Sequence, residues 1–143
     1  MIVSTVEYVT DFFERINKAL GLSMEFKYQI EDKGKFPICR KNDTIVIVPK
    51  FFYHKDISNE QRKMMMILLY SVAYLSRTRK VYPISPELLA KGICDSLDEK
   101  YLPMYKIEEV LRLIRINMYD DVKYASFFNI GDTVRAFLVI KSE

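Results

Sequence analysis

The apolar run from Met64 to Leu75 constrains the fold of this chain more than any other stretch. Apart from the hydroxyl groups of Tyr70 and Tyr74, its only polar side chain is that of Ser71. A helix that is apolar around its whole circumference has to be buried among other elements. The run has 12 residues, whereas a helix that crosses a membrane needs about 20. We therefore predict a buried central helix and no membrane association.

The length and composition are those of a globular domain. A chain of 143 residues can bury a sizeable hydrophobic core. Half of the residues are hydrophobic and 29% are charged, which is not the composition of a disordered chain. We predict a single domain over residues 1–143, and 53–58 is the place where a division into two units would fall.

The N-terminal residues 4–20 have the pattern of an amphipathic helix. Ser4 and Glu7 match a capping box, in which each side chain satisfies a backbone N–H group at the start of a helix. Apolar residues then recur every three or four positions, which places them on one face. Gly21 follows, as expected for a residue that ends a helix.

Three short strands are predicted next. Apolar and polar residues alternate over 24–30, which is the period of a strand with one exposed face. Residues 36–41 form a second candidate strand, and 44–49 are β-branched and apolar on both faces. Because short turns separate these segments, we expect a three-stranded antiparallel meander.

The second half of the chain is predicted to be helical until a final hairpin. Ser58 and Gln61 match another capping box, which opens the central helix. A third helix is expected from Pro86, and a fourth over 104–118. The segments on either side of a turn at Gly131 form a C-terminal β-hairpin. The predicted fold class is therefore α+β, with an N-terminal helix, the meander, three helices that include the buried central helix, and this hairpin.

Catalytic and metal-binding motifs are absent from the sequence. His54 is its one histidine, and Cys39 and Cys94 are its two cysteines. It has no HExxH, CxxC, GxSxG or P-loop pattern. We therefore predict that the protein is not an enzyme and holds no metal or cofactor. So few cysteines suit a reducing compartment, and we expect a cytoplasmic protein without a signal peptide.

The order helix, short antiparallel sheet and helix over residues 4–78 resembles that of small zincin metalloproteases, including the SprT-like and ImmA/IrrE-like families. In those families the second helix binds zinc. In the matching register, Tyr70, Ser71 and Tyr74 occupy the places of the first His, the Glu and the second His. Phenol and hydroxyl groups do not replace imidazole ligands of zinc or a carboxylate base. The resemblance therefore implies a zincin-like scaffold that lacks its metal ligands.

Residues 59–141 also follow the element order of a winged helix, with 104–118 as the recognition helix. The net charge of +3 is small, and Glu108 and Glu109 lie near the start of that helix, so both features oppose DNA binding. In this interpretation, basic side chains contact the phosphates of duplex DNA. These residues are Arg77, Arg79, Lys80, Arg112, Arg115, Lys123 and Arg135.

The aromatic content favours a protein interface. The chain has ten Tyr and nine Phe, and aromatic residues that a core does not hold tend to mark interfaces. We predict a small non-enzymatic binding or regulatory protein whose partner is another protein or a second copy of itself. DNA binding and the zincin-like scaffold are the alternatives. The candidate interface residues are Phe51, Phe52, Tyr53, Tyr101 and Tyr105.

Overall fold

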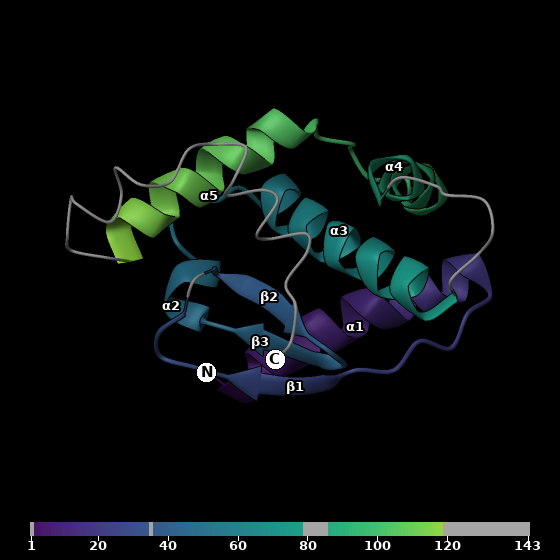
Figure 1. Cartoon of the computed structure of the whole chain (residues 1–143), viewed down its shortest axis with the longest axis horizontal. Helices are drawn as coiled ribbons and strands as arrows, with labels where there is room; N and C mark the ends of the chain where they lie inside the picture. The colour runs from purple at the N-terminus through teal and green to yellow at the C-terminus, as the bar shows by residue number, and fades with distance from the viewer. Residues whose placement is uncertain (1, 35, 79–85, 119–143) are drawn as a thin grey trace.

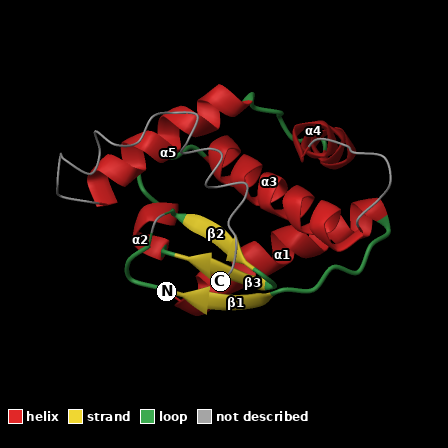
Figure 2. Cartoon of the chain, in the orientation of Figure 1, coloured by secondary structure: helices red, strands yellow, loops and turns green. Residues whose placement is uncertain are grey.

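Five helices and one three-stranded sheet make up the part of the chain that the structure describes (Figures 1 and 2). The structure is a computed structural model, and it describes residues 2–34, 36–78 and 86–118. The predicted α+β class is confirmed. In chain order, the elements are α1 (Ile2–Leu20), β1 (Lys27–Ile30), β2 (Ile38–Lys41), β3 (Thr44–Ile47), α2 (Pro49–Phe52), α3 (Asn59–Thr78), α4 (Pro86–Leu97) and α5 (Met104–Met118).

The sheet is mixed, so the predicted antiparallel meander is wrong. β3 lies in the middle, β2 pairs with it antiparallel, and β1 pairs with it parallel. The reason lies in the polarity of the strands. Ile45, Val46 and Ile47 of β3 are buried, which suits a central strand, whereas β1 exposes Lys27 and Gln29. The most apolar strand therefore takes the central position.

α3 is the buried pillar of the fold, as the apolar run predicts. Every side chain from Met64 to Ser71 is buried, and so is Ala73. The helix packs against α1, α4, α5 and β2. Its predicted capping box is confirmed, because the Ser58 N–H donates to Gln61 Oε1 at 2.8 Å and the Gln61 N–H donates to Ser58 Oγ at 3.1 Å. No helix among the described residues is long and apolar enough to span a membrane.

Two local predictions need correction. α1 begins at Ile2, so Ser4 lies inside the helix and is not its N-cap. The one-turn helix α2 was not anticipated from the apolar segment that ends at Pro49; proline suits the first position of a helix because it needs no N–H partner there. The C-terminal hairpin around Gly131 lies outside the described residues.

Asn17 connects three parts of the structure through one buried side chain. Its Nδ2 donates to the Met24 carbonyl oxygen at 2.9 Å, and its Oδ1 accepts the Met24 N–H at 3.0 Å. The same Oδ1 accepts the Tyr70 hydroxyl at 2.5 Å. Burial, followed by the nearby Glu14 charge, raises the pKa of Tyr70 to about 12, so the phenol remains a neutral donor. Asn17 thereby joins α1, α3 and the segment leading into β1.

Removing Asn17 should cost more stability than removing the Tyr70 hydroxyl. Asn17→Ala leaves the Tyr70 hydroxyl and both backbone groups of Met24 without their partner, so we expect a loss of about 3 kcal/mol. Tyr70→Phe leaves Asn17 Oδ1 bonded to Met24, and we expect about 1 kcal/mol. Urea unfolding of the two variants measures the difference, and equal losses would contradict this account of the Asn17 bonds.

Candidate functional site

The positions matched to the zincin ligands carry side chains that are used in packing. Tyr70 and Ser71 are fully buried, and Ser71 Oγ donates to the Ile67 carbonyl oxygen at 2.8 Å, one turn earlier in α3. Tyr74 is half-buried on the same helix. Among the described residues, no three His, Cys, Asp or Glu side chains gather where they could hold a metal ion. The polar atoms at positions 70 and 71 are therefore occupied by bonds within the protein.

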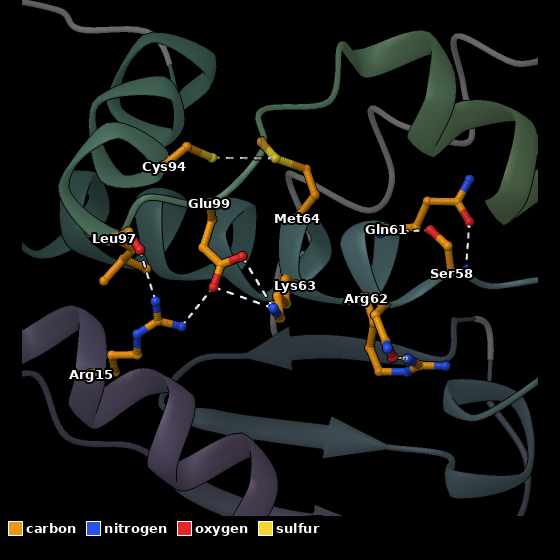
Figure 3. Close-up of polar contacts among 10 residues, drawn as sticks. Arg15, Ser58, Gln61, Arg62, Lys63, Met64, Cys94, Leu97 and Glu99 are labelled. Carbon is orange, nitrogen blue, oxygen red and sulfur yellow. Dashed lines mark hydrogen bonds and ion pairs between the residues drawn. The ribbon is translucent and has the colours of Figure 1, made fainter.

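The thiol and imidazole groups also have structural surroundings. Cys39 and Cys94 are buried thiols outside any disulfide. Cys94 lies against Met64, with their sulfur atoms 3.8 Å apart (Figure 3). Burial, followed by the Asp95 charge, raises the pKa of Cys94 to about 11, so this thiol is protonated at neutral pH. His54 lies in the turn after α2, where its Nδ1 accepts the Asp56 N–H at 3.1 Å.

Arg62 is a buried cation held by neutral groups. Its Nε donates to the Phe52 carbonyl oxygen at 2.8 Å, Nη2 to the Ile57 carbonyl oxygen at 3.2 Å, and Nη1 to Asn59 Oδ1 at 2.6 Å. The guanidinium carbon lies 5.4 Å from the ring centroids of both Phe52 and Tyr53. Arg62 thus ties the first turn of α3 to α2 and to the turn between them (Figure 3).

Glu99 forms a charged node between α1, α3 and the end of α4 (Figure 3). Arg15 Nη1 donates to its Oε2 at 2.7 Å, and Lys63 Nζ donates to its Oε1 at 3.1 Å. Arg15 also donates to the Leu97 carbonyl oxygen at 2.8 Å. Burial alone would raise the pKa of Glu99, but the hydrogen bonds from Arg15 and Lys63 outweigh it and hold that pKa below its usual value.

Of the residues predicted to bind nucleic acid, Arg77 is used to hold α3 to the sheet. Its Nη2 donates to the Glu25 carbonyl oxygen at 2.9 Å and to Asp43 Oδ1 at 2.7 Å. Its guanidinium carbon lies 4.9 Å from the Phe26 ring centroid. Arg112 is exposed on α5, which lies away from this end of α3 (Figure 1). The two arginines are therefore not brought together.

For the other five residues predicted to bind nucleic acid, the structure describes no side chain. Arg115 falls within α5. The remaining four lie outside the described residues: Arg79, Lys80, Lys123 and Arg135.

The predicted aromatic interface residues divide into buried and exposed ones. Phe51 and Phe52 are buried in the core. Tyr101 is half-buried, and burial, followed by the Glu87 charge, raises its pKa. Tyr53 and Tyr105 are 46% and 55% exposed, so they remain as surface aromatics.

The outer face of α5 holds the exposed side chains among those described for that helix, over 105–113. Ile107, Val110 and Leu111 are buried and share one face. Five exposed residues lie within about 120° of arc on the opposite face. They are Tyr105, Lys106, Glu109, Arg112 and Leu113. We call these five residues the α5 outer face. Leu113, which is 43% exposed, was not singled out from the sequence, although it stands eight positions after Tyr105.

Sequence reasoning also missed Asn17, Arg62 and Glu99. Asn17 carries a detectable signal, because it stands four residues after Phe13 on the predicted apolar face of the first helix. Glu99 carries none, because its partners Arg15 and Lys63 become neighbours only in the folded chain. Arg62 bonds to residues close to it in the chain, but no pattern in the sequence shows that its side chain is buried.

Comparisons with models of known protein families, with curated proteins and with solved structures found no match to this chain.

Glu99→Gln tests the charged node. Because the folded pKa of Glu99 is depressed, its stabilising effect is present above the ordinary Glu pKa of about 4.3 and is lost as the pH falls through the folded pKa. We expect the variant to lose about 1 kcal/mol of stability at pH 7. The difference in free energy of unfolding between the wild type and Glu99→Gln, measured by urea unfolding, should become smaller in acid. Glu109→Gln, at an exposed carboxylate on α5, is the control. A stability difference between the wild type and Glu99→Gln that does not change with pH would contradict this account of Glu99.

Proposed function

We propose that this protein is a non-enzymatic binding protein that acts through the α5 outer face on a protein partner. Two large apolar side chains, Tyr105 and Leu113, project from that face and are about half exposed. This observation carries the proposal, because exposed aromatic and leucine side chains on a helix that buries its other face are suited to burial against a second protein. The charged residues between them provide a polar setting for such a contact.

The polar side chains near α3 have structural roles. The polar atoms of Asn17, Tyr70 and Ser71 bond to other groups of the chain, and Arg62 and Glu99 are held in the same way. These groups stabilise the packing of α3. We interpret residues 4–78 as a zincin-like scaffold in which the positions of the metal ligands carry side chains that pack within the protein. We also propose a cytoplasmic location, which the two buried thiols support.

Substitutions on the α5 outer face should weaken partner binding without unfolding the protein. We expect the double variant Tyr105→Ser/Leu113→Ser to bind a partner about 30-fold more weakly, which corresponds to about 2 kcal/mol for the loss of central apolar contacts. The immobilised chain is used to capture proteins from an extract of its source cells. The affinity for each captured protein, after purification, is then measured by calorimetry.

The matched control is Leu88→Ser, which removes an exposed leucine from α4. It should leave the affinity unchanged. Equal capture by the wild type and by the α5 double variant would overturn the proposal. Loss of capture by the α4 control as well would show that the effect is not specific to the α5 outer face.

Duplex DNA is the second candidate partner. Lys106 and Arg112 are exposed on the helix predicted for recognition, and this observation favours it. Glu109 on the same face opposes it. If DNA is the ligand, its affinity should fall steeply with salt, and Arg112→Ala should reduce the slope of log affinity against log salt by about 1. Lys91→Ala on α4 is the control. Binding that does not change with salt would remove this candidate.

A further inference from the structure

The outer edge of β1 has backbone groups that point away from the sheet. The Lys27 N–H donates to the Asp43 carbonyl oxygen at 2.8 Å, and the Glu31 N–H donates to the Ile47 carbonyl oxygen at 2.9 Å, so alternate residues of β1 face β3. The N–H and C=O groups of Tyr28, between them, point the other way, as do those of Ile30. Within the described residues, β1 is at the end of the strand order (Figure 1).

The side chains of β1 and of Glu31, which follows it, separate into a polar row and a packed row, and Glu31 is half-buried at the end of the polar row. Lys27 and Gln29 are exposed, and the Gln29 amide donates to the Glu31 carboxylate, which places these residues along one face. Tyr28 and Ile30 are half-buried on the other face, where they pack against the core. The edge therefore presents the charge order Lys27, neutral Gln29, Glu31.

This charge order is complementary to itself in the antiparallel direction. When two copies of β1 meet with Gln29 opposite Gln29, Lys27 of each copy stands opposite Glu31 of the other. In the same register Tyr28 stands opposite Ile30, and these are the residues whose backbone groups point outward, so they exchange hydrogen bonds as an antiparallel pair does. Opposite charges placed across such a pair are stabilising.

We propose that the protein forms a symmetric dimer in which β1 pairs with β1 of a second copy, giving one continuous sheet across both chains. The opposite charges of Lys27 and Glu31 favour a second copy of the same chain as the partner of this edge. Moving the register so that Tyr28 faces Tyr28 removes the ion pairs, and one further step places Lys27 opposite Lys27, which is unfavourable. The arrangement has the two-fold symmetry that most homodimers adopt. It does not use the α5 outer face.

Charge exchange tests this pairing. Sedimentation equilibrium of the full chain should show a wild-type dimer. Lys27→Glu places Glu opposite Glu, and Glu31→Lys places Lys opposite Lys, so each single variant should dissociate at least tenfold more readily. An equimolar mixture of the two single variants should dimerise again, because every facing pair is then of opposite charge. Lys27→Glu/Glu31→Lys in one chain should also restore the dimer.

The matched control is Lys41→Glu, the same charge change on the other edge strand, β2; it should leave the dimer intact. Recovery in the mixture excludes misfolding of the single variants as the cause of their dissociation. A wild-type chain that remains monomeric at high micromolar concentration would overturn the proposal, and so would a dimer that Lys27→Glu leaves unchanged. Neither result would affect the test on Tyr105 and Leu113, so the two proposals fail separately.

Discussion

The burial of α3 is the constraint on which the rest of the structure depends. A helix with so few polar side chains is stable only when other elements cover it on all sides, and α1, α4, α5 and the sheet do so. The Ser71 hydroxyl bonds to the Ile67 carbonyl oxygen within the helix, so the buried Tyr70 hydroxyl needs a partner from another element. Asn17 is that partner, and its bonds to Met24 set where the chain leaves α1 to enter the sheet.

The charged residues near the core have structural roles for a related reason. Arg62 bonds mainly to backbone carbonyl oxygens, Arg77 bonds to one carbonyl oxygen and to the Asp43 carboxylate, and Glu99 receives hydrogen bonds from two basic residues. Each of these groups is partly withdrawn from water, so it has to be satisfied by the protein itself. Arg77, one of the basic residues that suggest a phosphate site in the sequence, thus holds α3 to neighbouring segments.

The two proposed contact surfaces lie on different elements and have complementary consequences. The edge of β1 would join two copies through backbone hydrogen bonds and ion pairs, while the α5 outer face would bind a protein partner through apolar contacts. A dimer of this kind presents two copies of the α5 outer face. Bivalent presentation raises the apparent affinity for a partner that is itself dimeric or clustered, without any additional contact.

Local patterns in the sequence determined the class of the fold, the buried helix, its capping box at Ser58 and Gln61, and the bounds of the last described helix. These features depend on residues a few positions apart, which periodicity reveals. Tertiary structure alone decided the strand order, the burial of Phe51 and Phe52, and the engagement of Arg77. Contacts such as that between Arg15 and Glu99, 84 residues apart, arise only when packing of the apolar surfaces brings distant segments together.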